Sequence, residues 1–514
     1  MRGCRRFAEP RSNAELPLGV VRREGRATAG EMGYCLGLMS IVTRFSRLRG
    51  WRSLVAASLI PLFVACAGTT SNQDAEWPPL VKKWYERAGS SLKTGDMQDA
   101  QLSSENALRL EPKRPEVRLQ AAKIALARLE FDRAVQLTEG LYNAETQAIR
   151  GRALWYAGRV QEAAETLEQL VSNPDIHDTW AVEIAKLARR GVGRKPFTMT
   201  GGMVAITDMP QVGRALLTPV ELDGQPALGM IATGMSETIV DAAGGTEPRW
   251  VSLRFGERIE VKDVPALTKD LSSLSRQLNA PVKVMLGINL LRHLHPTIDL
   301  YGGQFVVRSF DPPPPPVATV VSLSYARGGA MLVRGSFGEG EHAIPASFLV
   351  DTAMDVPMAL DEGGWKKAGK KLTDLKPLSG SRGISQGLVP VFGFGTLEIP
   401  DVPAISGVAI QEIEKPIEMD LDGVIGAGML APFRVTLADG GRTLWLEPMP
   451  VDPSMQQPSE GARSAAEGDK IAPPGPRGDA TTPAPSKPAV PASRPTGPAA
   501  TQPVSPSANA PLKH

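Results

Sequence analysis

A long internal duplication constrains the fold of this chain more than any other feature. Its centre is a shared Phe-Gly step followed by a strand-like run and then Asp-Val-Pro-Ala. The matched blocks are 224–241 with 341–360, 253–267 with 392–405, and 284–308 with 424–448. The offset between copies grows from 119 residues at the first block to 139 at the last, so the second copy carries about twenty extra residues. Two similar folded units are therefore expected.

The residue pattern of the duplicated half predicts an all-β region. After residue 198, short runs of Val, Ile, Leu and Phe are broken by Gly, Pro and Asp, which is typical of many short strands. Between the copies, Asp311 is followed by five consecutive prolines, which form a stiff extended spacer. We therefore expect a first lobe over 198–310, a linker over 311–318 and a second lobe over 319–451.

Each copy contains one short motif after an apolar strand. The second copy reads Val350-Asp351-Thr352-Ala353 and the first reads Ile231-Ala232-Thr233-Gly234. Later in each copy, an apolar pair precedes a glycine, Gly287 or Gly426. This order resembles the aspartic peptidases of the retropepsin or pepsin type, in which Asp-Thr/Ser-Gly forms the active loop and an apolar-apolar-Gly turn supports it.

The resemblance implies roles for further residues. It implies a bilobal all-β domain in which Thr233 and Thr352 link the lobes through their hydroxyl groups, Gly234 completes its loop, and Gly287 and Gly426 form the supporting turns. It also implies a glycine-flanked hairpin over the cleft. Phe392-Gly393-Phe394-Gly395 is the candidate for the tip of that hairpin, with Phe392, Phe394 and their counterpart Phe255 facing substrate.

The resemblance makes a peptidase activity doubtful because that chemistry needs two carboxylates. One carboxylate activates water while the other donates a proton to the carbonyl. Here Ala232 stands where the first lobe should supply an aspartate, so the candidate catalytic residues reduce to Asp351 and Thr352. A lone accessible aspartate is expected to titrate near a pKa of about 3.9 and to be ionised at neutral pH.

Other reactive groups give weaker patterns. Asp241 and Asp355 lie near the two motifs, but surface-charge roles are favoured for both. His293 and His295 form the pattern of a metal pair, yet loop or packing histidines are the favoured interpretation. No metal and no cofactor is expected.

Residues 77–197 predict an array of helices. Apolar and alanine positions recur at spacings of three and four, and three helix pairs can be traced. Ala100, Ala134 and Ala163 mark the repeat, at spacings of 34 and 29 residues. The pattern resembles tetratricopeptide repeats, in which small residues let neighbouring helices pack closely. An unrelated helical bundle is the alternative.

The N-terminal region predicts export. After Met39, four arginines lead into a short apolar run, Leu54–Ala65, followed at once by Cys66. Phe63-Val64-Ala65-Cys66 resembles the lipobox of bacterial lipoproteins, which implies a signal region over 1–65, with the true start at Met39, a lipidated linker over 66–76 and membrane attachment through lipid on Cys66. By the same resemblance, Ala67 implies sorting to the outer membrane, facing the periplasm. An ordinary signal peptide is the alternative.

Net charge limits the class of partner, and composition predicts the nature of the C-terminal tail. Residues 1–65 carry 11 of the 57 basic and 4 of the 55 acidic side chains, which leaves a formal charge of −5 on the rest. Nucleic-acid binding needs a clustered positive surface, so no nucleic-acid partner is expected. Residues 452–514 hold 14 prolines and no aromatic residue, which predicts a disordered tail.

Three functions are compatible with these features. The first is a lipid-anchored periplasmic protein whose degenerate cleft binds a peptide or partner protein. The second is an active aspartic endopeptidase, with Asp351 from two chains meeting in a homodimer. The third is a structural lipoprotein whose lobes only pack.

Overall fold

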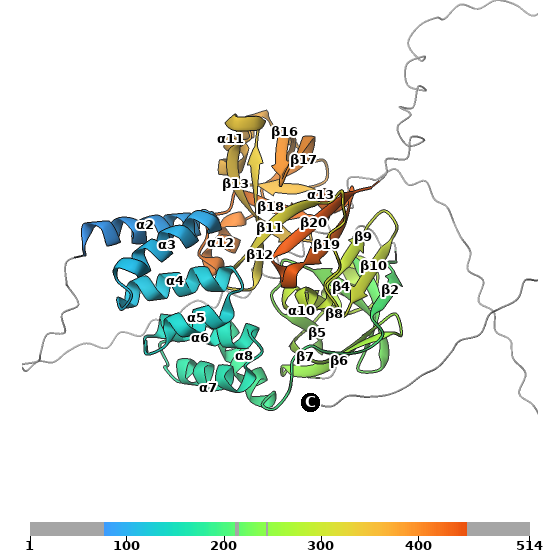
Figure 1. The fold of residues 1–514 in the computed structure, drawn as a ribbon. Helices are drawn as coiled ribbons and strands as arrows, with labels where there is room; N and C mark the ends of the chain where they lie inside the picture. The colour runs from blue at the N-terminus through green and yellow to red at the C-terminus, as the bar shows by residue number, and fades with distance from the viewer. Residues whose placement is uncertain (1–76, 211–214, 243–244, 450–514) are drawn as a thin grey trace, which may run out of the picture. The chain divides into compact units, whose positions relative to one another are not determined.

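The helical region comes first in the chain. The structure, a computed structural model, describes residues 77–210, 215–242 and 245–449. Helices fill its first part, as the sequence predicted (Figure 1). They are α2 (Pro79–Lys93), α3 (Met97–Leu110), α4 (Pro115–Ala127), α5 (Phe131–Thr138), α6 (Ala144–Tyr156), α7 (Val160–Val171) and α8 (Thr179–Arg190).

Local chemistry explains where these helices begin and how they pack. The carboxylates of Asp96 and Asp178 and the amide oxygen of Asn143 each accept a hydrogen bond from a backbone N–H of the first turn of α3, α8 and α6. The repeat-marking alanines of α3, α5 and α7 are fully buried, because a methyl group lets the next helix approach closely. Neighbouring helices in the chain pack against each other.

The first copy of the duplication forms a seven-stranded sheet closed on itself. Its strand order is β1-β7-β5-β8-β4-β3-β6, and β6 also pairs with β7. The strands are β1 (Thr198–Gly201), β3 (Leu217–Leu222), β4 (Gln225–Ala232), β5 (Thr238–Asp241), β6 (Arg249–Phe255), β7 (Ile259–Lys269) and β8 (Val282–Gly287). Helices α9 (Ser272–Leu278) and α10 (Ile288–Leu294) flank β8 in the chain.

The second copy repeats this topology within a thirteen-stranded sheet. Its own strands are β11 (Thr319–Ala326), β12 (Ala330–Phe337), β13 (Ile344–Asp351), β14 (Met358–Leu360), β15 (Lys376–Pro377), β16 (Ser385–Phe394), β17 (Leu397–Ser406), β18 (Gly423–Gly426), β19 (Phe433–Ala438) and β20 (Thr443–Pro448). Helices α11 (Glu362–Lys367), α12 (Ile410–Ile417) and α13 (Ala427–Leu430) lie between them in the chain. β16 also pairs with β12, which closes this half as β6 closes the first.

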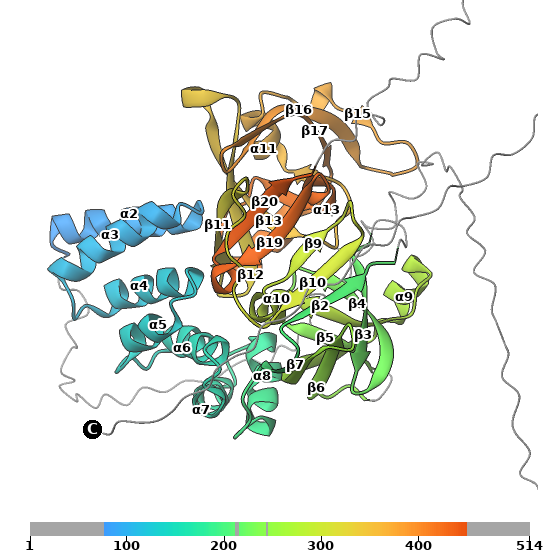
Figure 2. The ribbon, with the colours of Figure 1, turned by 45° about the vertical axis from the view of Figure 1, so that its right-hand side comes forward.

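Three strands of the first copy join the sheet of the second. β2 (Val204–Asp208), β9 (Thr297–Asp299) and β10 (Gln304–Arg308) continue the order β11-β20-β19-β9-β10-β2 (Figure 2). β9 pairs with β19, its counterpart in the duplication, and Thr297 lies opposite Thr436 in register. The predicted boundary near residue 310 therefore separates the two copies in sequence, but their strands share a sheet. The physical reason is that exposed edge strands need a hydrogen-bonding partner.

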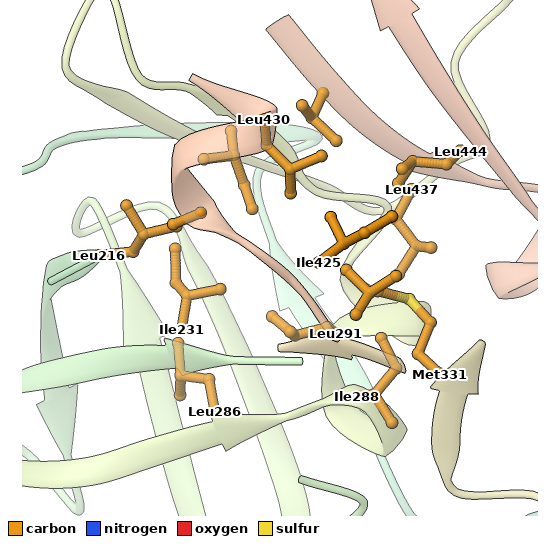
Figure 3. Close-up of a cluster of buried hydrophobic side chains, with 14 of the residues drawn as sticks. Leu216, Ile231, Leu286, Ile288, Leu291, Met331, Ile425, Leu430, Leu437 and Leu444 are labelled. Atoms are coloured by element: carbon orange, nitrogen blue, oxygen red, sulfur yellow. The ribbon is translucent and has the colours of Figure 1, made fainter. Parts of the chain in front are cut away.

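One hydrophobic core extends across both copies. Figure 3 shows Ile231, Leu286 and Ile288 of the first copy beside Ile425, Leu437 and Leu444 of the second. All six are at most 7% exposed. Burial of each such side chain stabilises the fold by about 1.5–3 kcal/mol, so the shared core holds the two copies in a fixed arrangement.

Candidate active site

The two motifs lie at equivalent positions in the two copies. β4 ends at Ala232 and pairs in parallel with β8, which places Ala232 opposite Gly287. β13 ends at Asp351 and pairs in parallel with β18, which places Asp351 opposite Gly426. The topology thus puts each supporting glycine beside its own motif.

Close backbone contacts explain both glycines. A Cβ atom on Gly287 would overlap the carbonyl oxygen of Glu237. A Cβ atom on Gly426 would overlap the carbonyl oxygen of Val356. In each copy the loop after the motif folds back over this glycine, so any larger residue would displace the loop.

Reciprocal threonine hydrogen bonds join the two motifs. Thr233 Oγ1 donates to the carbonyl oxygen of Val350 at 2.9 Å, and Thr352 Oγ1 donates to the carbonyl oxygen of Ile231 at 2.8 Å. The backbone N–H of Thr233 donates to Thr352 Oγ1 at 3.1 Å, and that of Thr352 donates to Thr233 Oγ1 at 3.0 Å. The structure therefore brings together Ala232, Thr233, Asp351 and Thr352 with approximate two-fold symmetry.

The carboxyl group of Asp351 is held by backbone donors from both loops. Its Oδ1 accepts a hydrogen bond from the N–H of Ala353 at 2.9 Å, and the N–H of Gly234 donates to the same carboxyl group. A Cβ atom on Gly234 would overlap this carboxyl group, which explains the glycine in the first copy. Burial raises the pKa of Asp351 above its ordinary value, and the two backbone hydrogen bonds partly oppose that shift. The expectation of an ordinary pKa near 3.9 is therefore wrong, because the paired loops desolvate the side chain.

The position in the first copy that is equivalent to Asp351 carries only a methyl group. Ala232 is fully buried and belongs to a cluster that also contains residues of the helical region. Asp241 has a structural role, since its carboxylate accepts hydrogen bonds from the N–H of Leu271 at 3.2 Å and from Lys283 Nζ at 2.7 Å. Asp355 is 8% exposed and not a surface charge, which corrects the sequence expectation.

The predicted cleft phenylalanines belong to the core instead. Phe392, Phe394 and Phe255 are fully buried. The ring of Phe392 packs against that of Phe348 at 5.2 Å between centroids. At the turn between β16 and β17, Gly395 lies beside Thr319 on β11. The prediction that these phenylalanines face substrate is therefore wrong, because the β16–β17 hairpin closes the second half of the sheet.

Another hairpin lies, like the predicted one, between the Asp351 loop and the Gly426 turn in the chain. Residues 378–384 connect β15 to β16, between the Asp351 loop and the Gly426 turn. The connection contains two glycines in the left-handed region, Gly380 and Gly383, which allow a tight turn. Its flanking residues Leu378 and Ile384 share a hydrophobic cluster with Met354, three residues after Asp351.

A buried carboxyl group beside the first motif was missed by sequence reasoning. Glu237 is 5% exposed. It accepts hydrogen bonds from Tyr156 Oη on α6 at 3.1 Å, from Trp180 Nε1 on α8 at 3.2 Å and from Asn289 Nδ2 on α10 at 3.4 Å. Burial raises the pKa of Glu237, and these three hydrogen bonds partly oppose the shift. Glu237 therefore anchors two helices of the repeat region to the first copy.

A comparison of the two copies could have indicated Glu237 from the sequence. At the offset of 119 residues, Glu237 corresponds to Val356, which is buried in an apolar cluster of the second copy. A carboxyl group in one copy at a position that is apolar in the other indicates a contact that only the first copy makes.

The two histidines contact an aromatic ring and a carboxylate. The ring of His293 stacks on Phe197 with 4.4 Å between centroids, and burial lowers its pKa to about 3. His295 Nδ1 lies 2.7 Å from a carboxylate oxygen of Asp311. Within residues 77–210, 215–242 and 245–449, no group of three or more His, Cys, Asp or Glu is placed to hold a metal ion.

Comparisons with known proteins give partial likenesses. No protein family model and no curated protein matches this chain. Among solved structures, an Arabidopsis OM64 TPR domain covers 22% of this chain and 95% of its own, at 20% identity and a TM-score of 0.20. A retropepsin-like aspartic protease from Rickettsia conorii covers 25% of this chain and 88% of its own, at 19% identity and a TM-score of 0.19. An aspartic proteinase from Irpex lacteus covers 48% of this chain and 98% of its own, at 11% identity and a TM-score of 0.34.

These TM-scores are low and the coverage is partial. The described part of the chain has a helical region followed by β-rich, barrel-like sheets. The predicted lipidation residue, Cys66, and the predicted tail over 452–514 lie outside the described residues. In the described part of the chain, no helix has the length and hydropathy needed to cross a membrane.

Proposed function

We propose that this chain is a catalytically silent relative of the aspartic peptidases, which binds a peptide or partner protein instead of cleaving it. One observation carries the proposal. The two motif loops are joined by their threonines, as a working pair of loops would be, yet of the two equivalent positions only Asp351 supplies a carboxyl group, because the other is Ala232.

The missing carboxylate removes one half of the acid–base chemistry. In the two-aspartate mechanism, one group must hold a proton while the other accepts one from water. The methyl group of Ala232 can do neither. General acid–base participation typically contributes about 10² to 10⁴ in rate, so one aspartate alone supports at most a trace of hydrolysis.

Asp351 retains a use in binding. Because burial raises its pKa, its protonated form extends to higher pH than that of an exposed aspartate. A protonated carboxyl group donates one hydrogen bond and accepts others, so it can hold a peptide carbonyl without attacking it.

The sequence further supports an exported form. We propose that Cys66 carries lipid and anchors the protein in the outer membrane, facing the periplasm, on the basis of the lipobox-like residues before it. The homodimeric peptidase is the second candidate. It is disfavoured because Thr352 already pairs with Thr233 of the same chain, and a second Asp351 loop would have to displace that partner.

A paired cleavage and binding assay tests the proposal. A library of extended peptides is incubated with the full-length protein between acidic and neutral pH, alongside Asp351→Asn. We expect no cleavage above background by either protein, and saturable binding of some library members. Robust wild-type cleavage that Asp351→Asn abolishes would overturn the proposal, and a rate rising with the square of the protein concentration would then identify the homodimer. Absence of any bound peptide would remove the binding role.

A further inference from the structure

The second copy of the duplication contains an insertion that is rich in lysine. Residues 242–248 connect β5 to β6 in the first copy, whereas residues 361–384 connect β14 to β16 in the second. The longer connection contains six basic and three acidic side chains, although the chain after residue 65 carries a formal charge of −5. The first copy folds without such a segment, so the fold of the copy does not explain the positive charge of the insertion.

Buried apolar side chains hold the insertion against β16. Trp365 is fully buried. A Cβ atom on Gly387 of β16 would lie 2.7 Å from Leu375 Cδ2 and 3.1 Å from Cη2 of Trp365. Both ends of segment 365–375 therefore pack against the same residue of the strand. The lysines within and directly after this segment consequently share one small region of the surface.

Four lysines of this region form what we call the lysine surface: Lys366, Lys370, Lys371 and Lys376. Lys370 is half-buried and the other three are exposed. Within the described residues, none of the four forms an ion pair. Two nearby carboxylates instead hold the backbone, since Asp361 accepts from the N–H of Gly364 at 2.6 Å and Asp374 accepts from the N–H of Lys371 at 3.0 Å. The lysine surface therefore attracts anions outside the molecule.

An anionic phospholipid surface fits this region better than a soluble polyanion does. Leu372 follows Lys371 directly and is 44% exposed, although its side chain is apolar. Lysines around an exposed apolar side chain are typical of segments that contact anionic headgroups. The proposed lipid on Cys66 would keep the chain beside a bilayer, and on that part of the proposed function the inference rests. We propose that the lysine surface binds the headgroups of anionic phospholipids.

This contact is weak by itself. Each lysine close to an anionic bilayer strengthens binding roughly fivefold, and dissolved salt screens the attraction. The lysine surface therefore orients a chain that lipid already anchors, and it does not hold an unanchored chain on membranes during cell fractionation.

Co-sedimentation with vesicles tests the proposal on the full-length Cys66→Ser protein, which cannot carry lipid at that position. One set of vesicles is pure phosphatidylcholine, and the other also contains the anionic lipid phosphatidylglycerol. We expect at least about tenfold tighter binding to the anionic vesicles. The preference should disappear at about 1 M salt, where the screening length falls to about 3 Å. The result depends neither on lipidation in cells nor on peptide binding, so its failure is distinguishable from failure of the proposed function.

Two quadruple variants in the same background assign the binding to the lysine surface. Replacing its four lysines by Gln should lower the affinity for anionic vesicles at least about tenfold. The control replaces by Gln four exposed lysines that lie elsewhere, and it should lower the affinity by about twofold at most. These control residues are Lys83, Lys113, Lys195 and Lys415.

A third variant tests the apolar contribution. Leu372→Ser should weaken binding to the anionic vesicles about threefold, because it removes apolar area that contacts the headgroup region. Equal binding of the Cys66→Ser protein to both kinds of vesicle, equal losses in the two quadruple variants, or unchanged affinity in Leu372→Ser would overturn the proposal.

Discussion

At the scale of single residues, the two motif loops differ at two paired positions. The first loop has Ala232 and Gly234 where the second has Asp351 and Ala353. Gly234 lies against the carboxyl group of Asp351, where a Cβ atom would overlap it. By the approximate two-fold symmetry, Ala353 is equivalent to Gly234 and Ala232 is equivalent to Asp351. A methyl group at 353 is therefore compatible with a methyl group at 232. We infer that the residue types at positions 232 and 353 are coupled, because a carboxyl group at one position requires a glycine at the other.

This coupling predicts that an aspartate introduced at position 232 alone lowers the stability of the fold. Ala232→Asp should destabilise the protein by about 1–3 kcal/mol through overpacking, and desolvation beside Asp351 adds to that cost. Ala232→Asp combined with Ala353→Gly should recover part of the loss, because the glycine makes room for the carboxyl group. Urea denaturation of the wild type, both single variants and the double variant gives the interaction energy. Additive effects of the two changes would contradict the coupling.

The raised pKa of Asp351 predicts a pH dependence of stability. A raised pKa means that the folded state holds the proton more tightly than the unfolded chain, whose aspartates titrate near about 3.9. The stability that Asp351 contributes is therefore fully present below that value and is lost as pH rises through the folded pKa. Each unit by which the pKa is raised corresponds to about 1.4 kcal/mol.

Asp351→Asn supplies the comparison for this effect. The asparagine retains the side-chain shape but does not titrate, so the wild type should lose stability relative to Asp351→Asn between acidic pH and neutral pH. The measurement is the difference in unfolding free energy between the two proteins at intervals across that range. A difference that stays constant with pH, or one that grows in favour of the wild type, would contradict the burial effect.

At the scale of secondary-structure elements, a loop of the first copy determines where the helices attach. Glu237 lies between β4 and β5 and accepts hydrogen bonds from α6 and α8. Trp250 on β6 adds a second attachment, since its Nε1 donates to the carbonyl oxygen of Leu187 on α8 at 2.9 Å. The same strand therefore contributes to the sheet of the first copy and to the surface against which the last helix packs.

Substitutions of Glu237 distinguish the stability contributed by its hydrogen bonds from the stability contributed by its charge. Glu237→Gln keeps an acceptor for Tyr156 and Trp180 but turns its amide NH2 towards Asn289 Nδ2, so it loses one hydrogen bond and should cost about 1–2 kcal/mol of stability. Glu237→Val introduces the residue of the second copy and leaves all three donors, Tyr156, Trp180 and Asn289, without their acceptor, which should cost about 2–5 kcal/mol. Thermal or urea unfolding of both variants is the measurement. Equal destabilisation by Gln and Val would show that hydrogen bonding is not the important contribution.

At the scale of the whole molecule, the two copies share one central sheet. Thr297 and Thr436 hydrogen-bond across the β9–β19 pairing at 2.7 Å, and Arg434 Nη2 donates to Asp299 Oδ2 at 2.8 Å. The Thr297–Thr436 contact repeats the 139-residue offset of the last duplicated block, and both contacts reinforce the threonine pair at the motifs. A homodimer formed through Asp351 loops would have to break both sets of contacts within each chain.

The proposed membrane attachment also belongs to this scale. Cys66 follows the apolar run directly, so Cys66→Ser should prevent lipidation and move the protein from the membrane fraction to the soluble fraction. Fractionation of expressing cells measures this, with Ser71→Ala in the predicted linker as the control that leaves Cys66 in place. Wild-type amounts of Cys66→Ser in the membrane fraction would refute the lipoprotein prediction.

The sequence by itself determined the features that depend on local pattern and on repetition. The helical region, the duplicated β half, the two motifs and their supporting glycines could all be predicted, because spacing and residue size along the chain are enough to indicate them. Tertiary structure alone decided the rest. Phe392 and Phe394 lie in the core, and Asp351 has a raised pKa. Comparison of the copies marks Glu237 as different from Val356, but only the tertiary structure decides that its partners are Tyr156 on α6 and Trp180 on α8. The physical reason is that burial and charge environment depend on which distant segments pack together, and no local pattern records that contact.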